Sequence, residues 1–438
     1  MIWLAVAFVL GFAVAVLGAI FLREIIVPRR LGRLFAEIPK TMRFDLATPA
    51  SMRNMVVLAE PGVEPWFSER RAGVMLTNLR TLHPERAATR KPLWASGEDT
   101  RPCRFFPTVA PPTGVTLPPE SGTLDGVLLA WPWHYPSREK HHIAFARAIV
   151  GAGAQAMILS DERQDPNQLV DLLVRAGIER NGFMVLPSPV DDVWIRDYGP
   201  TFVKMADGTF TLIANPYVPG EHPYRKGDNA VSLAVGAALD LPVYRLPLTV
   251  EGGNLVSDGH GLMVTSTATL DRNPELSERD VASIMRHYFG CDRTHFIDAL
   301  PGEVTGHADM VVRFIDRTTV VVASAPSGHQ WARAFDKIAD SLAALPSSAG
   351  TPFTVLRLPL ATSASSSAFW SYVNCTQVNG TTIVPTFGCE TDASALDFYR
   401  KATGGPAIGL DFADFLVGSA HCQSKEIPVG ALGKRGTP

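Results

Sequence analysis

The chain lacks the features that mark several large classes of protein. Its 438 residues include only five cysteines, and no two form a CxxC pair, which argues against a zinc ribbon or a thioredoxin-like redox site. The sequence contains no GxGxxG or GxxxxGK[ST] motif, so neither a dinucleotide site nor a P-loop is indicated. A net charge of −3 provides no basic surface for nucleic acid. We therefore expect no nucleic-acid partner.

The N-terminus carries one long apolar run. Residues 2–22 contain no charged side chain, and a helix of that length spans the ~30 Å hydrocarbon core of a bilayer. Four arginines follow the run: Arg23, Arg29, Arg30 and Arg33. The positive-inside rule then predicts a single-pass membrane protein with its body in the cytoplasm. A cleaved secretory signal, with a secreted or extracytoplasmic body, is the alternative.

The remaining chain divides by composition. Residues 23–120 are rich in arginine and proline and include the run PTVAPPTGVTLPP at 107–119, which predicts a stiff extension or spacer. From residue 121 to 432, short apolar runs that favour strands alternate with amphipathic stretches that favour helices. Residues 433–438 form a tail. The sequence thus predicts one large α/β domain of many strands and few helices after a membrane anchor (1–22) and a spacer.

Five motifs in this domain combine carboxylates, a histidine and a thiol next to glycines. They are DDVWIRDYGP (191–200), EGGNLVSDGHG (251–261), TGHAD (305–309), SYVN (371–374) and GSAHC (418–422). A guanidinium is planar and carries five N–H donors, so carboxylates that accept paired hydrogen bonds are suited to hold it. Attack on its carbon needs a strong nucleophile such as a thiolate, and a histidine can both donate and accept protons. The motifs therefore predict an enzyme that acts on arginine-like groups.

Four residues are the candidates for this chemistry. Asp197 and Asp309 are predicted to clamp the guanidinium, His307 to act as acid and base, and Cys422 to be the nucleophile. The GHAD spacing predicts that His307 and Asp309 lie two apart on an extended segment, with both side chains on one side of a sheet.

With these residues identified, the chain resembles the agmatine deiminase and Porphyromonas-type peptidylarginine deiminase family of guanidino-modifying enzymes. The resemblance covers about 120–430 and rests on eight segments in family order: LLAWP (128–132), WIRDYGP (194–200), EGGN (251–254), DRNPELS (271–277), TGHAD (305–309), SYVN (371–374), NGTTIVPTFG (379–388) and HCQSKEIP (421–428). It implies a pentein-like fold, a five-bladed, pseudo-fivefold ββαβ propeller with the site at its centre.

The same resemblance implies a reaction and a set of residues. Cys422 would attack the guanidino carbon, ammonia would leave, and hydrolysis of a thiouronium adduct would give a ureido product. Trp194 matches a tryptophan that lines the substrate, and three further residues match pocket positions: Glu251, Asn254 and Asn374. No metal or organic cofactor is implied. The run VGSAHC has fewer glycines than the GGGxxHC of agmatine deiminases, so a peptidyl-arginine or arginine-like substrate is favoured over agmatine.

Other interpretations stay open at this point. An amidinotransferase would pass the same adduct to an amine, and a membrane-tethered binding protein would keep the pocket without turnover. His307 with Asp309 suits a metal pair, although no third and fourth ligand follow at plausible spacing. Asp197 suits a structural ion pair with Arg196. The sequence alone leaves the oligomeric state undetermined.

Overall fold

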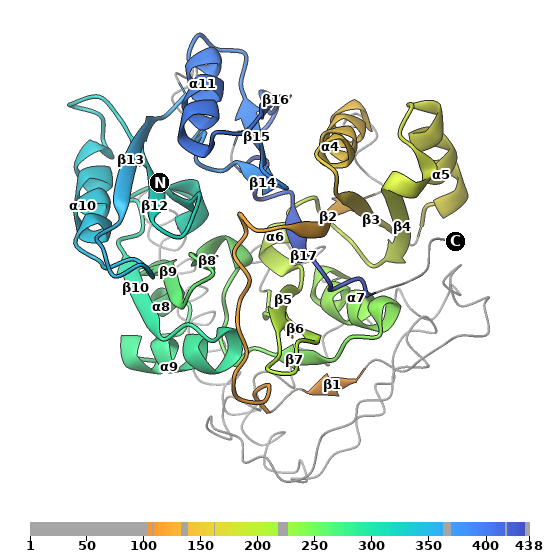
Figure 1. Cartoon of the computed structure of the whole chain (residues 1–438), viewed down its shortest axis with the longest axis horizontal. Coiled ribbons are helices and arrows are strands. Elements are labelled where there is room, and N and C mark those ends of the chain that lie inside the picture. Colours follow the sequence, from red (N-terminus) through yellow and green to blue (C-terminus); the bar gives the residue numbers. More distant parts are fainter. Residues whose placement is uncertain are drawn as a thin grey trace, which may run out of the picture. The chain divides into compact units, whose positions relative to one another are not determined.

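The computed structural model describes residues 104–106, 109–132, 139–161, 163–217, 227–361, 369–416 and 418–433. These residues form an α/β structure of five small mixed sheets with helices packed against them (Figure 1). One pattern recurs in every sheet: two antiparallel strands, a helix, and a third strand that runs parallel to its neighbour. The recurrence of strand–strand–helix–strand units agrees with the predicted ββαβ units.

Three of the sheets consist of one such unit and nothing more. The first contains β8 (Val256–Ser257), β9 (Leu262–Ser266), α8 (Ala268–Asp271), α9 (Glu278–Phe289) and β10 (Arg293–Ile297). The second contains β11 (Val312–Phe314), β12 (Thr319–Ser324), α10 (Ala332–Ala343) and β13 (Thr354–Pro359). The third contains β14 (Thr376–Val378), β15 (Thr381–Thr386), α11 (Asp392–Thr403) and β16 (Ala407–Asp411).

The other two sheets each gain a fourth strand. One consists of β5 (Thr201–Lys204), β6 (Phe210–Ala214), α7 (Val231–Leu239) and β7 (Val243–Arg245), with β1 (Phe105–Phe106) parallel to β7 at its edge. The other joins the two ends of the domain: β17 (Lys425–Pro428) runs antiparallel to β2 (Leu124–Trp131), and α4 (Glu139–Gly151), β3 (Gln155–Asp161), α5 (Pro166–Arg175) and β4 (Phe183–Ser188) follow. This pairing places the last strand of the domain beside its first long strand.

Local sequence signals explain several of these boundaries. Ser277 and Asp280 form a reciprocal capping box at the start of α9, and Gly290 ends the helix in the left-handed conformation. Asp165 accepts a hydrogen bond from the backbone of Asn167 at the start of α5. Asn379 and Gly380 have φ angles of 47° and 82°, as a type I′ hairpin between β14 and β15 requires.

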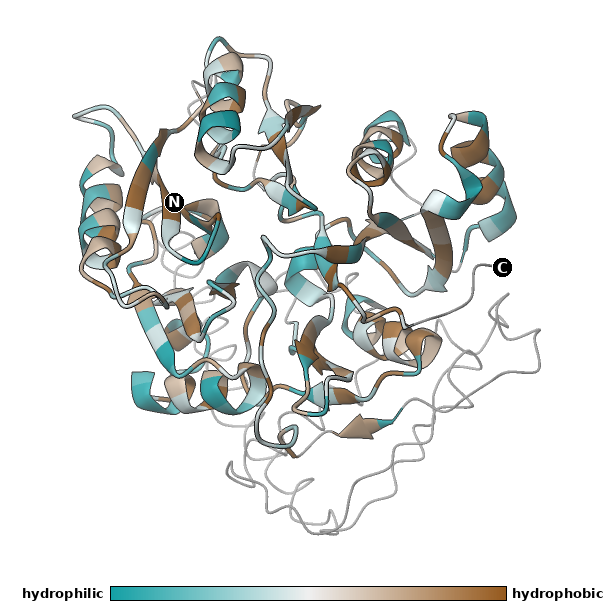
Figure 2. Cartoon of the chain, in the orientation of Figure 1, coloured by the Kyte–Doolittle hydropathy of each residue, from teal (hydrophilic) through white to brown (hydrophobic). Residues whose placement is uncertain are grey.

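The strands supply most of the core. Figure 2 shows hydrophobic colour along most strands, whereas the helices alternate between hydrophobic and hydrophilic residues. Side chains such as Val127, Ile158 and Val321 have no exposed surface. Because β2 and β3 are covered on both faces, both read as nearly continuous apolar runs in the sequence.

Three short helical turns carry Asp197, Asn254 and Asp309, and each turn begins immediately after another motif residue: Trp194, Glu251 or His307. They are α6 (Ile195–Tyr198), η8 (Gly252–Asn254) and η9 (Ala308–Met310); two more, η5 (Arg180–Gly182) and η7 (Gly227–Ala230), lie outside the motifs. The described end of the predicted spacer packs on the domain, since β1 joins a sheet and the Thr116 amide donates to the Lys204 carbonyl at 2.8 Å. The spacer therefore reaches the domain as part of its structure.

The predicted membrane location needs correction. Within the part of the chain that the structure describes, no helix is long and apolar enough to cross a bilayer. The predicted anchor over residues 1–22 lies outside the described residues. This finding contradicts the single-pass membrane location inferred from residues 2–22, because no membrane-spanning helix is found among the described residues.

Candidate active site

Cys422 lies in a turn just before β17, and its backbone is fixed on both sides. The residue is buried, with 4% of its surface exposed. Its amide donates to Asn374 Oδ1 at 3.3 Å, and its carbonyl accepts from the Arg196 amide at 3.1 Å. The SYVN, WIRD and HC motifs, far apart in the sequence, therefore meet at the thiol.

His307 lies beside this thiol at the start of η9. Its Nε2 is 2.6 Å from Glu251 Oε2, and its Nδ1 is 3.7 Å from Asp197 Oδ1. Gly253 lies against the ring: a Cβ on that residue would come within 2.4 Å of Nδ1. The EGGN motif thus contributes both a carboxylate that orients the imidazole and a glycine that gives it room.

The two predicted clamp residues approach the same place from α6 and η9. Asp309 Oδ2 is 2.7 Å from His421 Nδ1 and 3.8 Å from Cys422 Sγ. The other oxygen of Asp309, Oδ1, has no hydrogen-bond partner among the described residues, nor do Asp197 Oδ1 and His307 Nδ1. Buried carboxylate oxygens are costly without donors, so the site is suited to a cationic ligand with several N–H groups.

His307 and Asp309 meet by a different route from the one predicted. His307 is extended, with φ −83° and ψ 134°, but Asp309 lies in the 3-10 turn that begins immediately after it. A tight turn, not a strand, brings the two side chains to one site. Asp197 also differs from its structural interpretation, since Arg196 pairs with Glu426 and Glu120 instead.

Burial dominates the electrostatics of the site. Burial raises the pKa of Asp197 to about 7, although His307 opposes the shift. Burial lowers the pKa of His307, but Asp197, Cys422 and Glu251 together raise it well above its usual range. Burial and then the Asp309 carboxylate raise the pKa of the Cys422 thiol to about 12, although the neighbouring His307 opposes the shift. These shifts favour a protonated imidazole next to a protonated thiol.

The four predicted pocket residues divide into two pairs. Trp194 packs edge-on against Phe415, with ring centroids 5.8 Å apart, and Gly418 has φ +71° with its Cβ position 2.7 Å from the indole. Glu251 bonds both His307 and Arg272. Glu251 therefore borders the site directly, whereas the Trp194 indole packs against Phe415 and Gly418.

The two asparagines lie behind it, with no exposed surface. Asn254 Oδ1 accepts from the amides of Ser266 and Ala308 at 3.2 and 3.0 Å. Asn374 Oδ1 accepts from Ser419 and Cys422 amides. Asn254 therefore holds the His307 turn and Asn374 holds the Cys422 turn.

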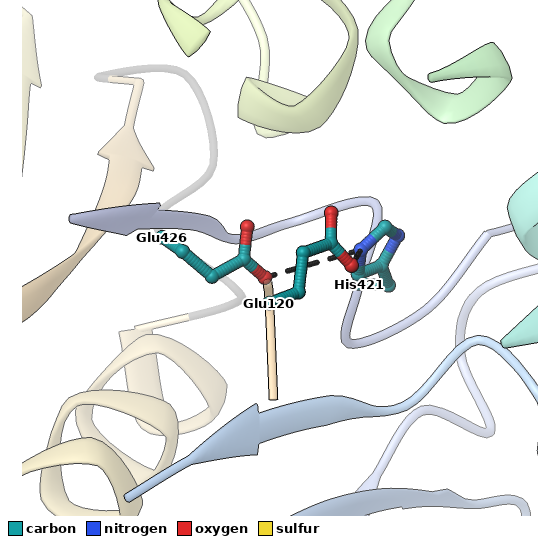
Figure 3. Close-up of side chains that lie close together, drawn as sticks. All are labelled: Glu120, His421 and Glu426. Carbon is teal, nitrogen blue, oxygen red and sulfur yellow. Dashed lines mark hydrogen bonds and ion pairs between the residues drawn. The ribbon is translucent and has the colours of Figure 1, made fainter. Parts of the chain in front are cut away.

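A second polar layer, which the sequence did not reveal, lies under Asp309. Figure 3 shows Glu120, His421 and Glu426 converging, with His421 Nε2 2.9 Å from Glu120 Oε2. Arg196 binds both oxygens of Glu426 at 2.7 and 2.8 Å and Glu120 at 3.0 Å, and Arg313 binds Glu120 at 2.6 Å. We name these five residues the buried charge network.

This network has the composition of a metal site but not its free ligands. One ligand atom from each of Glu120, His421 and Glu426 lies within 4.8 Å of the others. Arginine N–H groups already engage both oxygens of each carboxylate, so a metal would have to displace Arg196. The arrangement fits an ion-pair network better than a metal centre.

A small cavity adjoins the network. Its lining includes Glu120, Arg196, Lys425 and Glu426, and none of the four predicted catalytic residues. Lys425 is 4% exposed and makes no ion pair with a described residue. Burial and then Arg196 lower its pKa to about 7.

Comparison with known proteins places the chain among deiminases. The profile of the family described as "Porphyromonas-type peptidyl-arginine deiminase" matches residues 116–428. A protein of Marinomonas sp. (strain MWYL1) named "Putative agmatine deiminase" is 26% identical over 358 residues, which span 72% of this chain and 95% of the relative.

Solved structures resemble the fold. The agmatine deiminase of Enterococcus faecalis has a TM-score of 0.63 and 20% identity, over 72% of this chain and 96% of that one. A cysteine-to-serine variant of the C. jejuni agmatine deiminase with substrate bound has a TM-score of 0.61 and 19% identity over the same shares. At these identities the likeness is one of fold, and it agrees with the α/β structure seen here.

Proposed function

The chain belongs to the Porphyromonas-type peptidyl-arginine deiminase family and is a hydrolase acting on C–N bonds of linear amidines, and we propose that it converts an arginine-like guanidinium into a ureido product plus ammonia. One observation carries the proposal. Asp197 and Asp309 are buried carboxylates, and each has one oxygen with no hydrogen-bond partner among the described residues. The second oxygen of Asp309, Oδ2, lies 3.8 Å from the Cys422 thiol. A guanidinium supplies the N–H donors and the positive charge that these oxygens lack.

Binding itself activates the nucleophile in this proposal. Burial, followed by Asp309 and Asp197, raises the pKa of Cys422. A guanidinium held between the carboxylates offsets their negative field, so the thiol releases its proton to solvent more readily when substrate is present. The thiolate forms a bond to the central carbon, and a C–N bond breaks to give ammonia and a thiouronium on Cys422.

His307 moves the protons. Its raised pKa keeps it charged in the free site, so it donates a proton to the departing nitrogen. The neutral ring then accepts a proton from water, whose oxygen adds to the thiouronium carbon as the C–S bond breaks. Glu251, at 2.6 Å from Nε2, holds the ring throughout. The net change is guanidinium plus water giving a ureido group and ammonium.

We also propose that the five sheets are the blades of a pseudo-fivefold ββαβ propeller, with the catalytic domain spanning 121–432. The recurrent unit in each sheet supports it, as does the pairing of β17 with β2 across the ends of the domain. In such an arrangement the turns α6, η8 and η9 and the Cys422 turn face a common centre.

The substrate proposed first is a peptidyl-arginine or another arginine-like guanidinium. The family description and the glycine-poor VGSAHC run support it. Agmatine is the second candidate, favoured by the name of the Marinomonas relative. Two further candidates remain: an amidinotransferase, which would need an acceptor amine in place of water, and a non-catalytic guanidino-binding protein.

A substrate panel tests the proposal. The full chain is offered agmatine, free arginine, and peptides with internal or C-terminal arginine, and ureido product and ammonia are both measured. Turnover of one substrate that disappears in Cys422→Ala supports deimination. Transfer of an amidino group to added amines, or binding without ammonia release, would replace it with the transferase or the binding protein.

A further inference from the structure

We propose that His421, held from behind by Glu120, is a positioning residue that fixes the orientation and charge of the Asp309 carboxylate. The inference deepens the proposed function, on which it rests, because it assigns a task to residues that do not face the substrate. It concerns the buried charge network shown in part in Figure 3.

The geometry makes His421 a bridge between two carboxylates. Its Nδ1 is 2.7 Å from Asp309 Oδ2 and its Nε2 is 2.9 Å from Glu120 Oε2, and the residue is 1% exposed. A neutral imidazole has one donor and one acceptor, so it satisfies only one carboxylate. The ring satisfies both when both nitrogens carry protons. Burial opposes the ionised form of both acids, yet their pKa values are lowered, with His421 a main cause.

Two arginines hold the Glu120 carboxylate. Its Oε1 accepts from Arg196 at 3.0 Å and its Oε2 from Arg313 at 2.6 Å. Arg196 also bonds Glu426 through two short contacts, so the anchor extends into β17. The imidazole therefore lies between Asp309 and an anion that two arginines hold.

The arrangement divides the two oxygens of Asp309 between separate tasks. Oδ2 is occupied by His421, while Oδ1 has no hydrogen-bond partner among the described residues. The substrate then meets a carboxylate that is already ionised and already oriented. Such preorganisation removes the cost of arranging the group during binding.

Two substitutions of His421 separate its contacts. In His421→Asn the side-chain amide reaches only as far as the Nδ1 position and keeps the donor to Asp309. In His421→Gln the amide reaches the Nε2 position and loses that donor. We expect His421→Gln to raise KM by about 10- to 100-fold. The protection constant, defined as the guanidinium concentration that gives half of the maximal change in the rate at which iodoacetamide alkylates Cys422, should rise by about the same factor. His421→Asn should retain most of the wild-type affinity, with a smaller effect on kcat than on KM.

Glu120→Gln tests the anchor and also serves if His421→Gln fails to fold. It leaves the Asp309 contact in place but removes the charge behind the ring, so an effect of about 3- to 10-fold on the same protection constant is expected. His295→Asn is the matched control, because His295 on β10 bonds Ser341 and touches no residue of the site. Its protection constant should equal that of the wild type.

The outcomes are distinct. Equal protection constants for His421→Gln, Glu120→Gln and the wild type overturn the inference, as does an equal loss in His421→Asn and His421→Gln, which would make the histidine a mere packing element. The protection assay needs no turnover. A wild-type protein that binds guanidinium but converts no substrate would refute the proposed function and leave this inference standing on its own result.

Discussion

Buried carboxylates are paired differently in two neighbouring regions of the molecule. One region is the candidate site, which contains Asp197 and Asp309, and the other is the buried charge network behind Asp309. On the site side, Asp197 and Asp309 each keep an oxygen without a hydrogen-bond partner among the described residues. On the network side, arginines engage both oxygens of Glu120 and of Glu426. An unpaired buried carboxylate costs stability, whereas a paired one resists change. The contrast indicates that the candidate site is suited to bind a cation, and that the buried charge network stabilises the geometry of that site.

Removing the Cys422 thiol is expected to have the largest effect on activity. Cys422→Ala is expected to lower kcat by at least about 10³-fold, because no other described nucleophile faces the carboxylates. The change removes only one sulfur, so guanidinium binding should persist. Ammonia release gives the rate, and calorimetry with the same substrate gives the affinity. Retained turnover would mean that another group attacks the substrate.

The ionisation of Asp197 should make guanidinium affinity depend on pH. Its pKa is raised to about 7, chiefly by burial. Because a guanidinium binds the ionised form, affinity should rise about tenfold per pH unit below 7 and level off above it. Asp197→Asn should weaken binding by about 100- to 1,000-fold at pH 8, and by less at pH 6. A pH profile of the half-protection constant tests both; an unchanged slope in the variant would assign the ionisation elsewhere.

The same shift has a consequence for stability. A carboxyl group that binds its proton more tightly when folded contributes less to the free energy of unfolding as pH rises from its usual range to about 7. Guanidinium offsets that loss. The rise in melting temperature on adding ligand should therefore be larger at pH 8 than at pH 5.5.

Glu426→Gln tests the network side. It breaks the two-oxygen contact with Arg196 and leaves that buried guanidinium only partly paired. We expect the free energy of unfolding to fall by about 3 kcal/mol, since losing one partner of a buried pair leaves an uncompensated charge. Denaturant unfolding measures the loss. A fall of under about 0.5 kcal/mol would show that the network carries little of the stability.

Lys425→Met should produce the smallest effect and one of opposite sign. Burial lowers the pKa of Lys425 to about 7, so the unfolded chain binds its proton more tightly than the folded one. The cost of this lysine is therefore full below pH 7 and disappears as pH rises towards 10. Replacement by Met should raise the free energy of unfolding by about 1 kcal/mol at pH 6 and by nothing at pH 10. A loss of stability at pH 6 would mean that Lys425 is paired.

The sequence predicted the elements, and the motifs that meet at the candidate site, better than their arrangement. Ser277, Asp280, Asn379 and Gly380 act through neighbours a few residues away, so their roles can be inferred from spacing alone. The motifs likewise marked Cys422 and His307. Glu120 carried no such signal: it ends a proline-rich run and bonds His421 across 301 residues.

The asparagines illustrate the same limit. Asn254 and Asn374 stand in motifs next to the reactive residues, which suggested contact with substrate. Their side-chain oxygens instead accept backbone amides of the turns that carry His307 and Cys422. Sequence proximity identified the right neighbourhood, but which way a buried amide points depends on backbone groups from distant segments.

The most direct test of the account is the intact mass of the protein after rapid acid quench with a turnover substrate. We expect a species heavier than the free chain by the substrate minus one ammonia, located on Cys422 by peptide mapping and absent in Cys422→Ala. Steady ureido production with no adduct at any quench time, in an enzyme whose Cys422→Ala variant is equally active, would contradict the assignment of Cys422 as the nucleophile between Asp197 and Asp309.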